Sequence, residues 1–477
     1  MDSIKLPAAY QVTGHTDFVQ KGSTFVAISG KKVDGLKYIP KALQKGAATI
    51  VVERDIVLDS TLEMLIKKHH AKLVRVQSCR KALALLSAES LDYPAKKLKI
   101  IAVTGTKGKT STSYMIYHML KTLGKEVALS TTVEKLILDQ PVRLLLTTPL
   151  PDQLHVFLHE CVKHNAEYVV LEVSAQALSL HRVAGIEFDA GIFTNFSMEH
   201  LEFYNSMQEY FEAKSLLVRQ VKNSKNMFVN IDDQYGVLLK KMYPACSTYS
   251  LQDKQAVVYG WSHLDTHGIR LHVKVDSQTF MFQTILLGIF NAYNMLAALG
   301  VMHSLGFHLN DLMLSMTSLR VIPGRMERYS LKNKARCFID YAHNPSSFEA
   351  VLSTLRNMTD HLIVVFGAGG CRDKKKRPLM GSIAQKYSDV IVLTSDNPRD
   401  ESPQDIMNDI AQGLTDTTIE LHKELNRTKA IEFSYQLSRS GSIIAILGKG
   451  RDEYQIVGDL TFPFKERAII KKFIDEL

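Results

Sequence analysis

The chain has few of the features that mark secreted or membrane-bound proteins. It contains no run of 18 apolar residues, which argues against a transmembrane helix. The segment at 1–7 lacks the apolar core of a signal peptide, so we expect no leader. Only five of the 477 residues are cysteines, and they form no CxxC pair. Such a scattered, odd set is typical of reduced thiols in a cytoplasmic protein. The five are Cys79, Cys161, Cys246, Cys337 and Cys371.

The chain carries an excess of positive charge, but without the pattern of a nucleic-acid-binding surface. Its 58 Lys and Arg residues exceed its 49 Asp and Glu residues, for a net charge of +9. The one dense basic run lies at 372–377, and no basic stretch is interleaved with aromatic residues. Two classes fit this charge: a polyanion-binding protein, or a protein with a solvated basic surface and sites for small anions. We favour the second, and expect no nucleic-acid and no membrane partner.

Length and strand spacing predict an α/β protein with three domains. A chain of 477 residues is too long for a single core. We expect a small N-terminal α/β domain at 1–92, which ends at a polar linker at 91–97. In the central domain, at 93–325, strands alternate with helices as in a parallel sheet. A boundary at 322–324 precedes a C-terminal Rossmann-like domain at 326–477 with four more apolar strands.

The most informative motif lies where the first strand of the central domain ends. Apolar residues at 98–103 predict a buried strand, and a helix-compatible pattern begins at Thr110. Glycines between them direct backbone N–H groups and the positive end of the helix dipole at one point, which suits a phosphate. Lys109 supplies a cation, and the Thr110 hydroxyl can bind Mg²⁺. Because Val103 stands where a full P-loop has glycine, the motif is a shortened P-loop and the sheet P-loop ATPase-like. The predicted nucleotide-binding residues are Gly105, Thr106, Lys107, Gly108, Lys109 and Thr110.

Two further residues are candidate metal ligands. Glu172 is the one acid in an otherwise apolar strand at 168–174, and His200 follows the strand at 189–194. A carboxylate and an imidazole could bind Mg²⁺ opposite the phosphate loop. Alternatively, Glu172 is a carboxylate at the edge of the core that a helix N-terminus satisfies, and His200 is a structural histidine. The residues alone leave both interpretations open.

Lys214 has an unusual position on a predicted helix at 206–219. It falls within the apolar stripe of that helix rather than opposite it. A lysine there extends its amine to solvent, finds a partner or loses its charge. Conversion to a carbamate would remove the cation and provide oxygen ligands for a metal, whereas extension to solvent is the ordinary outcome. The apolar neighbours three or four residues away are Tyr210, Phe211, Leu217 and Val218.

The strands of the expected C-terminal domain end in polar or glycine-rich residues. Ligands of doubly wound sheets bind outside the carboxyl ends of the strands, so these ends predict a binding site that faces the nucleotide site. The Asp-Asn-Pro-Arg segment at 396–399 follows one strand, and Arg372 follows another. Because arginine binds carboxylates through two parallel hydrogen bonds, the pair Arg372 and Arg399 favours a small molecule with a carboxylate. A turn with a surface arginine is the alternative, and we weigh the two equally.

In their order and spacing, these segments resemble the Mur ligases, the ATP-dependent enzymes that add amino acids to peptidoglycan precursors. The resemblance covers nearly the full length. The motifs are TGTKGKT at 104–110, TTP at 147–149, EVS at 172–174, HL at 200–201, AK at 213–214, FNAYN at 290–294, PGRME at 323–327, DYAH at 340–343, DNPR at 396–399 and GKG at 448–450. Within this family, the chain most resembles the branch that adds meso-2,6-diaminopimelate to UDP-N-acetylmuramoyl-L-alanyl-D-glutamate. That resemblance implies ATP and Mg²⁺ as cofactors.

The resemblance implies a role for each matching residue. Lys109 and Thr110 would contact phosphate and Mg²⁺, and Glu172 and His200 would bind a second Mg²⁺. Lys214 would be a carbamylated lysine (N6-carboxylysine) that ligates metal; Lys109, Glu172, His200 and Lys214 form the implied catalytic set. Asn291, Arg325 and Asp340 would contact ATP across a domain boundary. The residues implied to bind the UDP-linked substrate, partly in the N-terminal domain, are Thr16, Thr147, Thr148, Ser174 and Arg182. Those implied to bind diaminopimelate in the C-terminal domain are Arg372, Asp396, Asn397, Arg399, Gly448 and Asp452.

The implied reaction makes an amide bond through an acyl phosphate. The D-glutamyl γ-carboxylate attacks the γ-phosphate of ATP, and the amine of diaminopimelate then displaces phosphate. We expect a cytoplasmic monomer that acts in peptidoglycan synthesis. The alternatives are a related ligase that adds L-lysine or another amino acid, a member of the folylpolyglutamate branch, or a non-catalytic nucleotide-binding homologue. Relatives that add lysine usually lack the arginine of the Asp-Asn-Pro-Arg turn, which favours diaminopimelate.

The chain departs from the family pattern at five places. The N-terminal Asp-Ser-Arg is His15-Thr16-Asp17, and the Ser-His after Ser174 is Ala175-Gln176. Lys107 replaces an asparagine, Cys371 replaces a polar residue, and Arg451-Asp452 replaces His-Glu. Because none of these changes removes a metal-binding or phosphate-binding group, we expect an active enzyme with altered nucleotide-sugar contacts.

Overall fold

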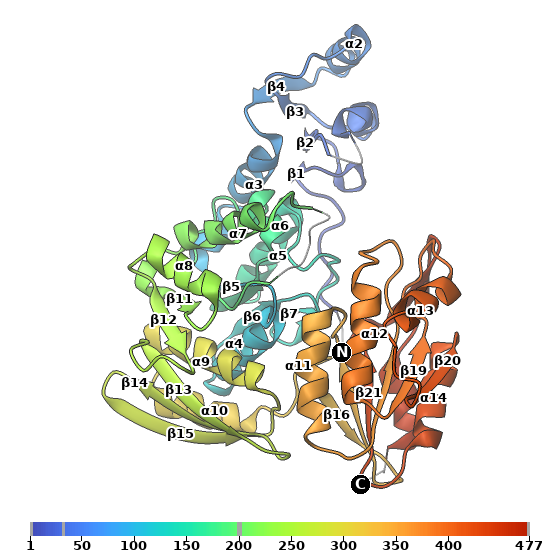
Figure 1. Cartoon of the computed structure of the whole chain (residues 1–477). Helices are drawn as coiled ribbons and strands as arrows, with labels where there is room; N and C mark the ends of the chain where they lie inside the picture. Colours follow the sequence, from blue (N-terminus) through green and yellow to red (C-terminus); the bar gives the residue numbers. More distant parts are fainter. Residues whose placement is uncertain (1–2, 31–33, 198–202, 475–477) are drawn as a thin grey trace. The chain divides into compact units, whose positions relative to one another are not determined.

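The computed structural model describes residues 3–30, 34–197 and 203–474, which form mostly parallel sheets covered by helices (Figure 1). The predicted α/β fold class is therefore confirmed. By their internal contacts the residues fall into two compact units. The first comprises 1–260, 273–280 and 293–316, and the second comprises 261–272, 281–292 and 317–477. In the described part of the chain, no helix combines the length and apolar character that a membrane crossing requires.

The first unit begins with a four-stranded parallel sheet in the order β1-β2-β3-β4. Successive residues of its strands alternate between two faces. Phe25 and Ile50 pack toward α1 and α2, whereas Val26 and Val51 pack toward α3. The elements are β1 (Val12–Thr13), β2 (Thr24–Val26), α1 (Ile39–Gln44), β3 (Thr49–Glu53), α2 (Ser60–Lys68), β4 (Lys72–Val76) and α3 (Cys79–Ser90).

The larger sheet of the chain has the order β15-β14-β13-β12-β11-β10-β5-β9-β6-β7-β8. The strands from β12 to β6 run parallel, and β7 and β8 run antiparallel at one edge. Its strands are β5 (Lys99–Thr104), β6 (Val127–Ser130), β7 (Lys135–Ile137), β8 (Gln140–Pro141), β9 (Tyr168–Glu172), β10 (Ala190–Phe193), β11 (Met227–Asn230), β12 (Ser247–Ser250), β13 (Val258–Leu264), β14 (Ile269–Val275) and β15 (Gln278–Thr284). The helices are α4 (Lys109–Thr122), α5 (Pro151–Lys163), α6 (Ala175–Ser179), α7 (Met207–Ser215), α8 (Gln234–Met242), α9 (Ile289–Ser304) and α10 (Leu309–Ser318).

Strand order brings three segments to one edge of this sheet. β5 lies between β10 and β9, and all three run in the same direction. Their carboxyl ends are Thr104, Glu172 and Phe193, so the loops that follow them emerge side by side. Ligands of parallel sheets bind at this edge. The predicted helix at 206–219 is shorter in the structure: α7 ends at Ser215, and a 3₁₀ turn at Leu216–Gln220 follows it.

The second unit contains a six-stranded sheet in the order β16-β17-β21-β18-β19-β20, antiparallel only between β16 and β17. Both faces are apolar because helices cover both. Val364 and Phe366 pack with α11, α12 and α13, and Ile363 and Val365 pack with α14 and α15. The strands are β16 (Glu327–Ser330), β17 (Arg336–Asp340), β18 (Leu362–Phe366), β19 (Val390–Thr394), β20 (Glu420–Glu424) and β21 (Ile443–Leu447), with a separate hairpin of β22 (Tyr454–Val457) and β23 (Leu460–Pro463). The helices are α11 (Pro345–Arg356), α12 (Lys376–Tyr387), α13 (Pro403–Ala411), α14 (Arg427–Leu437) and α15 (Glu466–Ile470).

A buried ion pair joins the ends of two of these strands. Arg427, the first residue of α14, donates Nε to Glu466 Oε1 at 2.8 Å, and both residues are 2% exposed. Its Nη2 donates to the Leu447 carbonyl at 2.9 Å and its Nη1 to the Ser395 carbonyl at 3.4 Å. Arg427 thus connects the carboxyl ends of β21 and β19.

We expect Arg427→Met to destabilise the chain by about 3–5 kcal/mol, because Glu466 is then left buried without its cation. Exchanging both partners for apolar residues, as in Arg427→Met with Glu466→Met, removes the stranded charge and should recover much of the loss. Thermal unfolding of the full-length variants measures both effects. A single variant as stable as the wild type would contradict this account of the pair.

Candidate functional site

The phosphate loop at 105–108 connects β5 to α4 and requires its two glycines. Gly105 has φ +140°, and a Cβ there would lie 1.9 Å from Thr194 Oγ1. Gly108 has φ +80°, and a Cβ there would lie 2.4 Å from Asn294 Oδ1. A side chain at either position would therefore combine backbone strain with a collision. The close approach of Thr194 and Asn294 thus requires glycine at both positions.

The loop is also braced by the segment that follows β10. The Asn195 carbonyl accepts a hydrogen bond from the Thr106 amide at 2.8 Å, and Asn195 Oδ1 accepts one from the Lys107 amide at 2.9 Å. Gly108 gives α4 no capping side chain. The N–H groups of the first helical turn therefore lie at the loop without a side-chain cap, which is the arrangement of a phosphate site.

Two lysines share one carbonyl oxygen of this loop. Lys109 Nζ donates to the Gly105 carbonyl at 3.0 Å and to the Thr106 carbonyl at 2.8 Å. Lys214 Nζ donates to the same Gly105 oxygen at 2.6 Å and lies 4.7 Å from the centre of the Tyr210 ring. Lys214 is 2% exposed, so its amine does not extend to solvent. Two ammonium groups on one oxygen repel each other, and either an anion beside them or loss of charge on Lys214 would relieve the repulsion.

Glu172, at the carboxyl end of β9, is buried beside the start of α4. Its Oε2 accepts hydrogen bonds from the Thr110 hydroxyl and the Thr132 amide, each at 3.0 Å. Its Oε1 accepts one from the Thr132 hydroxyl at 3.0 Å, and Thr147 Oγ1 lies 3.0 Å from the same hydroxyl. The carboxylate is thus held by threonines rather than by a helix N-terminus alone. A carboxylate beside a hydroxyl at a phosphate loop is a donor set that Mg²⁺ accepts.

The proposed metal ligands are only partly described. Thr110 and Glu172 lie together, as predicted, and Lys214 lies at the Gly105 carbonyl of the same loop. His200 falls outside the described residues. Among the residues that the structure describes, no three His, Cys, Asp or Glu side chains gather into a preformed metal centre.

Four residues predicted to bind substrate form one network next to Glu172. Thr148 Oγ1 donates to the Glu172 carbonyl at 2.8 Å and accepts a hydrogen bond from the Ser174 amide at 3.1 Å. Arg182 Nη1 donates to the Thr148 carbonyl at 3.0 Å, and Thr147 joins through Thr132. These residues therefore lie at the same edge of the sheet as the phosphate loop.

Thr16, the fifth predicted substrate residue, is tied to this edge through a residue that the sequence analysis did not single out. Thr16 is 4% exposed and begins a 3₁₀ turn at Thr16–Phe18. The preceding residues Thr13 and Gly14 donate to Asp152 Oδ2 at 2.7 and 3.3 Å. Asp152 lies in the first turn of α5, four residues after Thr148. Burial raises the pKa of Asp152 above its usual value, although these hydrogen bonds oppose the shift.

In the second unit, two residues predicted to contact ATP lie close together. Asp340, at the end of β17, accepts hydrogen bonds from the Met326 and Ala342 amides, each at 2.7 Å. Burial raises the pKa of Asp340, and the nearby Arg325 opposes that shift. The Arg325 guanidinium lies 4.7 Å from the centre of the Tyr341 ring. The third predicted residue, Asn291, is buried and donates its amide to the Leu287 carbonyl at 2.8 Å.

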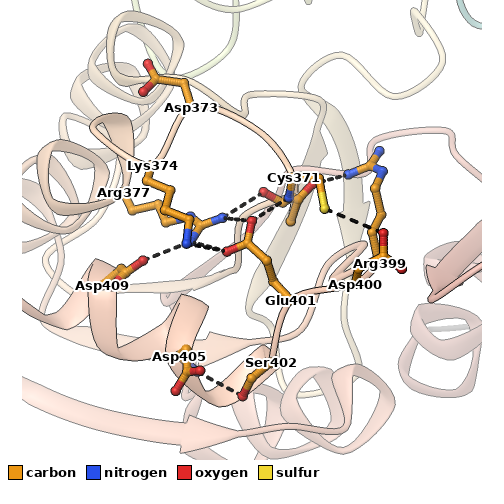
Figure 2. A network of polar contacts seen from close by, with 12 residues as sticks. Cys371, Asp373, Lys374, Arg377, Arg399, Asp400, Glu401, Ser402, Asp405 and Asp409 are labelled. Atoms are coloured by element: carbon orange, nitrogen blue, oxygen red, sulfur yellow. Dashed lines mark hydrogen bonds and ion pairs between the residues drawn. The ribbon is translucent and has the colours of Figure 1, made fainter. Parts of the chain in front are cut away.

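The side chains of Arg372 and Arg399 both pass close to Gly369, at the carboxyl ends of β18 and β19. A Cβ at Gly369 would lie 3.1 Å from Arg399 Nη1 and 3.7 Å from Arg372 Cγ. Arg399 Nη1 donates to the Gly370 carbonyl at 2.8 Å, which holds its guanidinium over the loop after β18. Figure 2 shows Arg399 extending from its own loop toward this neighbouring one. Two arginines from adjacent strand ends can bind a carboxylate.

The remaining predicted residues gather around a buried lysine. Lys449 is 0% exposed, donates to Asn397 Oδ1 at 2.9 Å and lies 3.4 Å from Asp396 Oδ1. Gly448 has φ +116°, and a Cβ there would lie 2.5 Å from Asp396 Oδ2. Burial raises the pKa of Asp452 to about 6, although the nearby Lys449 opposes the shift. Asp396, in contrast, has a lowered pKa, since Lys449 and other cations outweigh its burial.

Several supporting residues were missed at the level of sequence. Thr132 and Asn195 contact the predicted residues from separate strand ends, and only the strand order places them there. Lys449 belongs to the GKG motif at 448–450. The apolar strand before this motif does not predict that the Lys449 side chain is buried against Asn397. Asn195 could have been predicted as a candidate from its position after a strand of a parallel sheet, where ligand-binding loops lie.

Comparison with known proteins finds family matches to three successive parts of the chain. The family description "Mur ligase family, catalytic domain" matches residues 10–90, "Mur ligase middle domain" matches 103–302, and "Mur ligase, glutamate ligase domain" matches 324–450.

Similar proteins are found at full length. A UDP-N-acetylmuramoyl-L-alanyl-D-glutamate--2,6-diaminopimelate ligase of Caldanaerobacter subterraneus subsp. tengcongensis is 35% identical over 95% of this chain and 92% of its own length. An enzyme of the same name, numbered 1, from Clostridium acetobutylicum is 36% identical over 96% of this chain and 93% of its own. A solved structure of a ligase with that name is 28% identical, with a TM-score of 0.67 over 97% of this chain and 94% of the other.

The matches cover the N-terminal, central and C-terminal parts in the order expected for three domains. From these matches and from full-length relatives of more than 30% identity, we conclude that the chain belongs to the Mur ligase family.

Proposed function

We propose that this chain joins meso-2,6-diaminopimelate to the D-glutamyl γ-carboxylate of UDP-N-acetylmuramoyl-L-alanyl-D-glutamate in a reaction that consumes ATP. Enzymes of its family are ATP-dependent ligases. The observation that carries the choice of amino acid is that the side chains of Arg372 and Arg399 both pass close to Gly369. Diaminopimelate has a second carboxylate that lysine lacks, and two guanidinium groups suit that carboxylate. The full-length relatives that bear the name of this activity support the same choice.

The first step that we propose transfers the γ-phosphoryl group of ATP to the substrate carboxylate. The oxygen of that carboxylate attacks phosphorus, the bond to the β-phosphate oxygen breaks, and an acyl phosphate and ADP form. The first-turn amides of α4 bind phosphate oxygens, and Lys109 stabilises the negative charge that develops. Thr110 and Glu172, with His200, would hold Mg²⁺, which supplies further charge neutralisation when bound. Asn291, Arg325 and Asp340 would contact the nucleotide.

The second step that we propose forms the amide. The neutral amine of diaminopimelate attacks the acyl carbon and its nitrogen becomes cationic. That nitrogen loses a proton to solvent, and the tetrahedral intermediate expels phosphate to leave the amide. Water must be excluded, because it would hydrolyse the acyl phosphate. Thr16, Thr147, Thr148, Ser174 and Arg182 would hold the UDP-linked substrate.

The acceptor amino acid would be held by the second unit alone. Arg372 and Arg399 would bind its distal carboxylate, and Asp452 would face its distal ammonium group. Asp396 and Asn397 would shape the site through their contacts with Lys449, and Gly448 through its close approach to Asp396. A rigid set of hydrogen-bonding groups of this kind rejects an amino acid that leaves them unpaired.

For Lys214 we propose carbamylation. Its neutral amine would add to carbon dioxide and release a proton, which replaces a cation with an anion. This change would turn the repulsion with Lys109 at the Gly105 carbonyl into attraction. The remaining carbamate N–H could still donate to that oxygen, so the loop contact survives.

The wider setting is also a proposal. We assign the UDP-substrate domain to 1–92, the ATP domain to 93–325 and the amino-acid domain to 326–477. All five cysteines are free, which fits a reducing compartment, and we propose a cytoplasmic monomer with no nucleic-acid or membrane partner.

The proposed function is tested by parallel assays of phosphate release with UDP-N-acetylmuramoyl-L-alanyl-D-glutamate and either diaminopimelate or L-lysine. We expect kcat/KM to be about 10²-fold or more higher for diaminopimelate, because lysine has no second carboxylate to pair with the guanidinium groups of Arg372 and Arg399. Preference for lysine would reassign the amino acid. No turnover with either would favour the non-catalytic homologue.

We expect the KM for diaminopimelate to rise as the pH falls through about 6, the pKa of Asp452. Below that pH the carboxyl group is neutral and no longer attracts an ammonium group. Asp452→Asn should show the higher KM at every pH and lose this pH step. Since the raised pKa means that ionisation of Asp452 opposes folding above pH 6, the variant should be at least as stable as wild type at pH 7.5. A wild-type KM that is flat between pH 5 and 7 would contradict the role.

We expect Lys214→Ala to lose about 10²-fold or more in kcat and to recover partly with added short carboxylic acids, which can occupy the place of the carbamate. The matched control is Lys121→Ala, which removes a surface lysine paired with Asp139. This variant should keep the wild-type kcat and should not respond to added carboxylic acids. Full activity of Lys214→Ala without additives would refute carbamylation as a requirement.

A further inference from the structure

Arg377, on α12, is a completely buried arginine that the proposed reaction does not use. Its side chain is 0% exposed. Nη1 donates to Glu401 Oε2 at 2.9 Å and to Asp409 Oδ2 at 2.8 Å, and Nη2 donates to Glu401 Oε1 at 3.1 Å. Nη2 also lies 3.3 Å from the Gly369 carbonyl. Figure 2 shows Arg377 pointing between Glu401 and Asp409, which come from different segments.

Glu401 is the link between Arg377 and the two arginine-bearing loops. It stands two residues after Arg399, and its Oε1 accepts a hydrogen bond from the Cys371 amide at 2.5 Å. Cys371 is adjacent to Arg372. Lys374 Nζ lies 3.2 Å from Glu401 Oε2. The hydrogen bond from Arg377 lowers the pKa of Glu401 to about 2, so the carboxylate stays charged at any physiological pH.

The two loops are held at a defined spacing by these contacts. The Gly370 amide donates to the Asn397 carbonyl at 2.9 Å, and a Cβ at Gly370 would lie 1.8 Å from the Pro398 carbonyl oxygen. Cys371 and Arg399 both have left-handed backbones, with φ of +54° and +51°. Such conformations cost about 1–3 kcal/mol each and persist only where the surroundings enforce them. Glu401 contacts the backbone of one strained residue and follows the other by two positions.

Stability alone does not account for this arrangement. Burying a guanidinium carries a large desolvation cost, and apolar residues of similar volume often stabilise as well or better. The ion pairs also lie at the carboxyl ends of β18 and β19, where Arg372 and Arg399 emerge. A buried ionic group is better explained there by the geometry that it imposes on its surroundings.

We propose that Arg377 is a positioning residue for the acceptor amino acid. Through Glu401 it sets the spacing between the loop that carries Arg372 and the turn that carries Arg399. The two guanidinium groups are thereby held ready for one distal carboxylate, and Arg377 contributes to selection of a dicarboxylic amino acid without contacting it. This inference rests on the proposed function and deepens it.

The test compares Arg377→Met, Arg377→Lys and Glu401→Gln with wild type in the full chain. We expect the KM for diaminopimelate to rise about tenfold or more in Arg377→Met, with kcat and the KM for ATP within about twofold, because only acceptor binding is misplaced. Arg377→Lys, which keeps one ion pair, should recover part of the loss. The preference for diaminopimelate over L-lysine should fall by a similar factor, since lysine has no carboxylate for the arginine pair.

The matched control is Arg356→Met. Arg356, the last residue of α11, forms an ion pair at 2.6 Å with Asp389, which lies just before β19 rather than after it. The Arg356→Met substitution should leave the KM for diaminopimelate unchanged. A merely structural role for Arg377 predicts that the two variants behave alike, or that the KM values for ATP and diaminopimelate rise together, and either result overturns the proposal.

Glu401→Gln keeps the test decisive if Arg377→Met does not fold. The amide oxygen of glutamine can still accept from Cys371, but the charge that binds Arg377 is gone. The same selective rise in KM supports the proposal, and an unchanged KM overturns it. If wild-type protein turns over diaminopimelate and the variants have the wild-type KM for it, the positioning role alone is refuted. If wild-type protein does not turn over diaminopimelate, both the proposed function and the positioning role are refuted.

Discussion

Charge buried at the carboxyl ends of parallel strands constrains both units of this protein. An ionised side chain loses its hydration when it is buried, so it persists only where several partners replace the lost water. Glu172 finds three such donors in the first unit, and Lys449, Arg377 and Arg427 find acceptors in the second. Each of these groups restrains a loop that carries predicted site residues. The charges therefore determine loop geometry where binding is proposed.

The apolar sheets make this arrangement possible. In the second unit, alternate residues of β18 pack against helices on opposite faces, which leaves only the strand ends for polar groups. In the first, β5 lies between β9 and β10, so three loops meet at one edge. A loop at such an edge is tied to its neighbours by short hydrogen bonds, as the amides of Thr106 and Lys107 are tied to Asn195. The conformation of each loop therefore depends both on the position of its strand in the sheet and on the polar groups that the loop carries.

Much of the fold could be predicted from the sequence, and so could several features of the candidate site, because local signals carry them. The glycines of the phosphate loop and the place of Lys214 on an apolar stripe both depend on residues a few positions apart. The contacts of Thr132 with Glu172 and of Glu401 with Arg377 could not be predicted in this way. They join segments whose proximity follows only from strand order, and no local pattern encodes it. His200 lies outside the described residues, so its role stays a prediction.

The strained backbone at Cys371 and Arg399 connects these arguments. A left-handed conformation is costly for residues with a side chain, and here two occur in neighbouring loops. The cost must be offset by contacts that exist only in the folded unit, and Glu401 supplies one at the Cys371 amide. Because Glu401 is in turn held by the buried Arg377, the core of the unit enforces the loop conformation. If Arg372 and Arg399 bind a carboxylate as we propose, loops held in this way would reduce the entropy that binding costs, compared with two mobile loops.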